Sequence, residues 1–156
     1  MKKVSAHLDT VANSQGAAVL VTIGTGKLFS TGFDFKVWAE HPTNPFHTTS
    51  VMQEVYKKLL GLNVPTMCVI NGNAYAGGAF FTLCHDFRIM NENSNFALTE
   101  IHHGMQIGPA YNAIVRNLVD VQPARKLIMG YKFSANEAVS SRIANSIFKT
   151  PSEVEI

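Results

Sequence analysis

The chain has 156 residues, of which 46% are hydrophobic and 15% charged. These values predict one globular domain over residues 1–156 that can bury a core. A formal charge of only +2, with the 13 Lys and Arg scattered along the chain, argues against nucleic acid as a partner.

The first half of the chain alternates between predicted helices and strands. Residues 4–14 carry apolar side chains at helical spacing, and the apolar, β-branched run 17–23 is typical of a strand buried on both faces. Residues 27–34 are expected to form a loop that crosses the sheet edge. A second helix is predicted over residues 47–61, where Gly61 ends it.

The second half continues this order. A buried strand is predicted over residues 66–70, a turn at 71–72, and a short apolar helix from Gly77 to Leu83. Two strands, near 86–90 and 95–98, precede three helices near 109–118, 123–131 and 134–141. Strands and helices in this order indicate an α/β fold with crossover connections.

Residues 59–84 contain no charged side chain and are long enough to span a bilayer. The stretch also contains a proline, several amides and four glycines, which a lipid-exposed helix would not carry. We therefore expect no transmembrane segment. Polar residues follow Met1 too closely for a signal peptide, and the last residues are not a peroxisomal tripeptide, so no targeting signal is seen.

Two cysteines, Cys68 and Cys84, stand within apolar runs. This position predicts buried thiols in a reducing compartment rather than disulfides. Cys84 is followed by His85 and Asp86, but neighbouring side chains rarely point at one ion, so we predict no metal site.

Two features of the sequence have residue types that a catalytic site could use: the glycine pair Gly77 and Gly78, and the carboxylate of Glu100. Gly77 and Gly78 open a helix, whose first N–H groups have no internal partner and could hold a developing oxyanion; close strand–helix packing explains the glycines equally well. Glu100 ends an apolar run, where partial burial would raise its pKa and suit it to proton transfer. The alternative is an exposed glutamate at a strand end.

Two segments resemble the crotonase (enoyl-CoA hydratase/isomerase) superfamily. Residues 26–35, GKLFSTGFDF, resemble its first oxyanion segment, and residues 65–86, with NG, AGG and the start of DFRI, resemble its second. The likeness continues through 96–104 and 124–144.

The resemblance implies a crotonase-like spiral of ββα units, shortened at both ends. It also implies an acyl-CoA substrate whose thioester oxygen is held by the backbone N–H groups of Phe33 and Gly77. The implied substrate-binding residues are Ser30, Thr31, Gly32, Asp34, Phe35, Gly78 and Phe80.

The number of catalytic glutamates distinguishes the hydratases of this family from its isomerases. Hydratases of the family use two glutamates; here Phe80 stands at the first position and Glu100 at the second. This pattern is similar to Δ3,Δ2-enoyl-CoA isomerases, particularly the peroxisomal branch. It implies that Glu100 moves a proton from C2 to C4 of a 3-enoyl thioester during fatty-acid β-oxidation, in a peroxisome or mitochondrion. No cofactor is expected, because coenzyme A is part of the substrate.

Family members usually have an additional strand pair before the first buried strand and further helices beyond residue 148. The resemblance implies a homo-oligomer, the family's trimer. A second hypothesis is that the chain is a catalytically inactive subunit with a structural role in a larger, for example mitochondrial, complex.

Overall fold

The computed structural model describes residues 1–34, 36, 39 and 45–154. In chain order the elements before the centre of the fold are α1 (Lys2–Ala12), β1 (Leu20–Ile23), β2 (Leu28–Ser30), α3 (Pro45–Leu60), β3 (Thr66–Ile70), β4 (Asn73–Tyr75) and α4 (Gly77–Leu83). Those after it are β5 (Phe87–Asn91), β6 (Asn95–Ala97), the 3-10 helix η1 (Glu100–His103), α5 (Pro109–Leu118), α6 (Val121–Ile128), β7 (Phe133–Ser134), α7 (Ala135–Ser140), β8 (Ser146–Phe148) and the 3-10 helix η2 (Pro151–Glu153).

Consecutive strands go to different sheets. One sheet has the order β1-β3-β5-β8 with parallel pairing throughout, and the other has the order β2-β4-β6-β7. The strand pairs β1–β2, β3–β4 and β5–β6 therefore each place one strand in each sheet, and a helix follows each of the first two pairs. This repeated ββα arrangement is the spiral that the resemblance implies.

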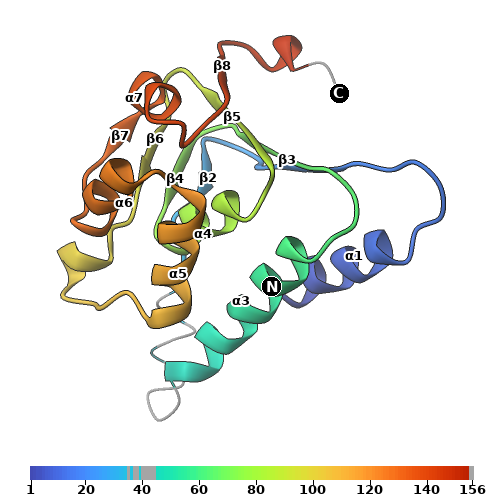
Figure 1. Cartoon of the computed structure of the whole chain (residues 1–156), viewed down its shortest axis with the longest axis horizontal. Helices are drawn as coiled ribbons and strands as arrows, with labels where there is room; N and C mark the ends of the chain where they lie inside the picture. The colour runs from blue at the N-terminus through green and yellow to red at the C-terminus, as the bar shows by residue number, and fades with distance from the viewer. Residues whose placement is uncertain (35, 37–38, 40–44, 155–156) are drawn as a thin grey trace.

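Helix α4 lies at the centre of the molecule, with α5–α7 on one side and the packed pair α1–α3 on the other (Figure 1). Six of its seven residues are buried. The charge-free stretch 59–84 therefore forms the buried strand β3 and the buried helix α4, as predicted, and also the short strand β4. Among the described residues no helix is long and apolar enough to cross a membrane.

The prediction that residues 17–23 are buried on both faces is wrong. Strand β1 is the edge strand of its sheet, and Val19 and Ile23 are 55% and 54% exposed. Apolar residues indicate a strand, but they do not tell an edge from the middle of a sheet.

Residues 27–34 were expected to be a loop, and this is also wrong in part, because they contain β2. This strand pairs parallel to β4, with a register shift between Leu28 and Ser30. The other strands that the sequence did not predict, β4, β7 and β8, have only two or three residues. So few residues carry no recognisable alternation.

Both cysteines are buried and unpaired, as predicted. Burial raises the pKa of both thiols, that of Cys84 to about 12. Since the thiolate is the reactive form, these are structural residues.

Candidate active site

The two glycine segments meet in the structure, although more than forty residues of sequence separate them. A Cβ atom on Gly32 would lie 2.9 Å from the backbone nitrogen of Gly77, and one on Gly78 would lie 2.5 Å from the Cβ of Ser30. Gly32 also has φ of +96°, a conformation that favours glycine. The segment after β2 therefore packs directly against the first turn of α4, and this contact requires glycine on both sides.

The residue that precedes α4 is held in an unusual conformation. Ala76 has φ of 50° and ψ of −125°, which is uncommon and strained for a residue with a side chain. Two hydrogen bonds hold it: its N–H donates to the Ala97 carbonyl (3.0 Å), and its carbonyl accepts from Phe80 N–H (3.1 Å). These contacts fix the direction of the peptide plane that carries the Gly77 N–H.

The backbone N–H groups of Phe33 and Gly77 are the predicted oxyanion donors. Neither makes a hydrogen bond within the described part of the chain, whereas the N–H of the intervening Gly32 donates to Ser30 Oγ at 3.2 Å. Both residues therefore keep a donor for a ligand.

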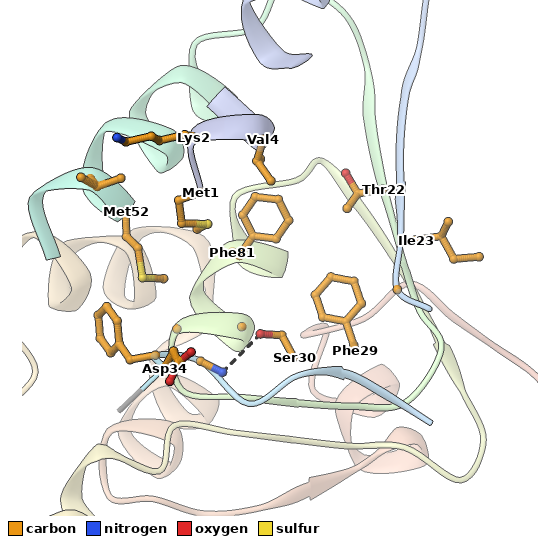
Figure 2. Close-up of a pocket in the computed structure, with 16 residues that line it drawn as sticks. Met1, Lys2, Val4, Thr22, Ile23, Phe29, Ser30, Asp34, Met52 and Phe81 are labelled. Atoms are coloured by element: carbon orange, nitrogen blue, oxygen red, sulfur yellow. Dashed lines mark hydrogen bonds between the residues drawn. The ribbon is translucent and has the colours of Figure 1, made fainter. Parts of the chain in front are cut away.

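A cavity of about 600 Å³ opens at this junction (Figure 2). Its lining comes from five places: the start of the chain with α1, the end of β1, β2 with the segment that follows it, α3, and α4. They are Met1, Lys2, Val4, Thr22, Ile23, Gly24, Phe29, Ser30, Gly32, Phe33, Asp34, Val51, Met52, Gly77, Gly78 and Phe81. Most are apolar, which suits a site that holds a mainly apolar ligand by a few polar groups.

Six of the predicted site residues line this cavity: Ser30, Gly32, Phe33, Asp34, Gly77 and Gly78. Thr31 is exposed and Phe80 is buried, and neither is among the lining residues. Phe35 lies outside the described residues.

Glu100, the predicted base, is the first residue of η1 and is only 7% exposed. Its Oε2 is buried without a hydrogen-bond partner among the described residues. Burial raises the pKa of this carboxyl, and its own backbone N–H and the charge of His103 partly offset the rise. Glu100 is therefore buried as expected, in surroundings that favour the protonated form.

Glu100 is not among the residues that line the 600 Å³ cavity. Aromatic rings form its surroundings: its charge contributes to the raised pKa values of Tyr56 and Tyr111, although burial is the main cause for both. The Tyr111 ring meets Phe80 at 5.0 Å and Tyr56 at 5.9 Å between centroids. The structure thus brings together the two predicted N–H donors, whereas the carboxylate is not among the residues that line their cavity.

A family model described as enoyl-CoA hydratase/isomerase matches residues 1–155. The chain belongs to this family. It is 30% identical to enoyl-CoA delta isomerase 2, peroxisomal, and 31% identical to enoyl-CoA delta isomerase 3, both from Arabidopsis thaliana. Each match covers 90% of this chain, and 67% and 66% of the respective relative.

The fold is also that of the family's solved structures. An enoyl-CoA hydratase from Bacillus anthracis superposes with a TM-score of 0.86 at 27% identity, over 95% of this chain and 58% of that one. This enoyl-CoA hydratase/isomerase family member thus spans about two thirds of the curated relatives named here and somewhat over half of the solved structure.

Two polar residues at the junction were not predicted from the sequence of this family member. Tyr56 donates from its hydroxyl to the Gly77 carbonyl at 2.7 Å. His85, dismissed as a metal ligand, places Nδ1 3.0 Å from the Phe81 carbonyl and Nε2 2.9 Å from the hydroxyl of Thr22, a cavity residue. A carbonyl only accepts, so Nδ1 carries the proton and Thr22 donates to Nε2. Within the described residues no group of His, Cys, Asp or Glu side chains could hold a metal ion.

Proposed function

We propose that the chain is an isomerase that binds a 3-enoyl-CoA thioester and moves its double bond to the 2-position. The observation that carries this proposal is the pair of N–H groups, Phe33 and Gly77, which lie on adjoining segments at one apolar cavity and make no hydrogen bond to any described residue. Membership of the enoyl-CoA hydratase/isomerase family and the names of the two Arabidopsis relatives support the same substrate class.

In the proposed reaction the thioester oxygen accepts hydrogen bonds from both N–H groups. Loss of a proton from C2 converts the thioester to a dienolate, whose negative charge gathers on that oxygen. Fixed donors stabilise this charge without having to reorient, and removal of one such donor commonly lowers the rate about 10²- to 10³-fold. The backbone junction would thus do the electrostatic part of catalysis.

Glu100 would take the proton from C2 and return it at C4, so that no proton is gained or lost overall. Its raised pKa suits a group that must both accept and donate. Since Glu100 does not line the cavity, the acyl chain has to extend beyond the cavity to meet it, or side chains have to move when substrate binds. No water-activating carboxylate is proposed, because Phe80 occupies the position of the hydratases' first glutamate.

The direct test is to follow formation of the conjugated 2-enoyl thioester from a 3-enoyl-CoA by its ultraviolet absorbance. Wild-type protein should turn over, and Glu100→Gln should lower kcat about 10²- to 10⁴-fold, the usual contribution of a general base. The acid limb of the kcat/KM profile should have an apparent pKa above the ordinary 4.5 of glutamate. Exposed Glu92→Gln is the control and should leave the rate unchanged.

One observation favours the second hypothesis, a catalytically inactive subunit of a larger assembly. The carboxylate is buried, lacks a partner for one oxygen and lies off the cavity, as a residue that never meets substrate would. A protein that binds a 3-enoyl-CoA without turnover, and that co-purifies in a stable complex, would support this hypothesis over the isomerase.

The name of one relative, enoyl-CoA delta isomerase 2, peroxisomal, extends the proposal to the peroxisomal oxidation of unsaturated fatty acids. Imaging of the tagged, natively expressed protein against peroxisomal and mitochondrial markers tests the compartment. Size-exclusion chromatography with light scattering tests the predicted homo-oligomer against a monomer or a mixed complex.

A further inference from the structure

Helix α3 contacts the candidate oxyanion segment through a tyrosine. Tyr56 is 1% exposed, and its hydroxyl donates to the Gly77 carbonyl at 2.7 Å, across 21 residues of sequence. Met52 lies one helical turn earlier on the same face; a Cβ atom on Gly77 would lie 2.7 Å from Met52 Cε and 3.6 Å from the Tyr56 oxygen. The first residue of α4 is therefore held between α3 and the segment at Gly32.

The hydrogen bond acts on the torsion angles of Gly77. The N–H of Gly77 lies in the peptide plane that it shares with the Ala76 carbonyl, and the Gly77 carbonyl lies in the next plane. Only the torsion angles of Gly77 relate the two planes, and glycine rotates about them more freely than any other residue. The plane before Gly77 is fixed by the bond from Phe80 N–H to the Ala76 carbonyl, and the plane after it by Tyr56. With both planes held, the torsion angles of Gly77 are fixed between them, and the plane that carries its N–H resists rotation.

We infer that Tyr56 is a positioning residue: by holding the Gly77 carbonyl its hydroxyl restrains the torsion angles of Gly77, and so keeps the N–H of Gly77 directed at the carbonyl oxygen of a bound thioester. This rests on the proposed function, because it assigns to Gly77 the role of oxyanion donor. Tyr56 itself contacts neither substrate nor the reacting atoms.

The protonation state of the phenol agrees with this role. Burial, followed by the nearby ionisable groups Tyr111, Cys84 and Glu100, raises the pKa of Tyr56 well above its ordinary value. The hydroxyl therefore keeps its proton and remains a donor over the whole working pH range.

A binding experiment separates this inference from the enzymatic activity. The probes are a saturated acyl-CoA thioester and the S-alkyl-CoA thioether of the same chain length, which lacks only the carbonyl oxygen. Isothermal titration calorimetry gives the ratio of their affinities for the full-length protein. We expect the wild type to favour the thioester, because only the thioester can accept from the two N–H groups.

The variants are Tyr56→Phe and, as the matched control, Thr82→Val. Thr82 is fully buried in α4 and its hydroxyl also donates to a backbone carbonyl of that helix, Ala79, at 2.8 Å. Each substitution thus removes one buried hydroxyl that donates to α4. Both should lower the melting temperature by similar amounts, but only Tyr56→Phe should reduce the preference for the thioester, by about 3- to 10-fold for one misdirected hydrogen bond.

Kinetics give a second readout. If 3-enoyl-CoA is turned over, Tyr56→Phe should lower kcat about 10-fold or more with little change in KM, since a misaligned donor affects the transition state most. Thr82→Val should leave kcat unchanged.

Each outcome has a distinct meaning. A thioester preference that is the same in Tyr56→Phe as in Thr82→Val overturns the positioning role and leaves the proposed function intact. If the wild type itself shows no preference, the oxyanion donors are wrong and the inference fails with them. A preference without turnover keeps the positioning role and overturns the isomerase.

If Tyr56→Phe does not fold, a second variant takes its place in the experiment. This variant carries 3-fluorotyrosine at position 56 and tyrosine at all other tyrosine positions. Its more acidic hydroxyl is a stronger donor on a ring of nearly the same size, so the preference for the thioester should rise. An unchanged or reduced preference in this folded protein would overturn the inference.

Discussion

The two parts of the candidate site, the glycine junction and Glu100, are stabilised in different ways. At the junction, Gly32 and Gly77 allow two backbone segments to touch. The backbone there is held by hydrogen bonds that Ser30 Oγ and the Ala97 carbonyl accept and that the Tyr56 hydroxyl donates. Glu100 sits among aromatic rings with one oxygen lacking a partner. The junction is thus ordered by satisfied contacts, whereas the carboxylate is held where its charge is unfavourable.

This difference separates a part of the site that folding itself forms, the glycine junction, from a part that lowers the stability of the folded state, Glu100. The predicted oxyanion donors are backbone groups whose two segments meet through the packing of the fold, whether or not catalysis occurs. A buried carboxylate without full hydrogen bonding costs stability, so it needs another reason to be present. Packing of the fold is therefore enough to explain the junction, whereas a buried Glu100 calls for a functional explanation.

The first prediction concerns the close contact between Gly32 and Gly77, where a substitution that adds a side chain is expected to have the largest effect on the junction. In Gly32→Ala the new methyl group would lie 2.9 Å from Gly77 N and from Ala76 Cβ, at a backbone φ of +96°. We expect turnover to fall about 10²- to 10³-fold, as for loss of an oxyanion donor, and the free energy of unfolding to fall by about 1–3 kcal/mol from steric overlap and strain. Steady-state kinetics and chemical denaturation measure the two effects.

Gly16→Ala is the matched control for that substitution. Gly16 has φ of +89°, but a Cβ there meets nothing within 4 Å. It should therefore lose stability through backbone strain and keep its activity. Equal losses of activity in both variants would show that the close approach of the two segments is unimportant.

The sequence predicted the junction better than the rest of the molecule. The bounds of β3, α4 and α5 agree with prediction, because the charge-free run, the paired glycines and Pro109 mark them locally. The family resemblance implied that the N–H groups of Phe33 and Gly77 serve one site, and the structure brings their two segments into contact at Gly32 and Gly77. Periodicity alone cannot give such a long-range relation.

The remaining differences have physical causes. Exposure of β1 depends on which strands pair with it, and this information is not local to residues 17–23. The separation of Glu100 from the cavity depends on where η1 places one side chain, and the role of Tyr56 on α3 lying against α4. Such side-chain relations between distant elements were not visible in the pattern of single residues.

The next prediction concerns His85, another buried titratable residue, which unlike Glu100 has a hydrogen-bond partner at both side-chain polar atoms. Burial lowers the pKa of His85 from 6.5 to about 4. Between these values the unfolded chain binds the proton and the folded chain does not, so stability should fall as pH falls from 6.5 to about 4. The expected loss is on the order of 3 kcal/mol.

Denaturation of wild type and His85→Gln across this pH range isolates the contribution. The variant has no proton to bind at this position, so its stability should depend less on pH. A wild-type and a variant curve of the same slope would show that His85 is not held neutral by the fold, and that the Thr22–His85 bond does not fix the strand β1 against α4.

The smallest effect decides between the two roles of Glu100. Its folded-state pKa is raised, so the folded state is disfavoured above that pKa, and the penalty disappears as pH falls below about 4.5, where the carboxyl is protonated in both states. The free energy of unfolding of Glu100→Gln should therefore exceed that of the wild type by about 1 kcal/mol at pH 8. This difference should vanish at pH 4. A gain in stability together with a loss of turnover would mean that the carboxylate is kept for its chemistry at the expense of the fold. The same gain in a protein whose wild type never turns over 3-enoyl-CoA would leave Glu100 without that explanation and favour the inactive subunit.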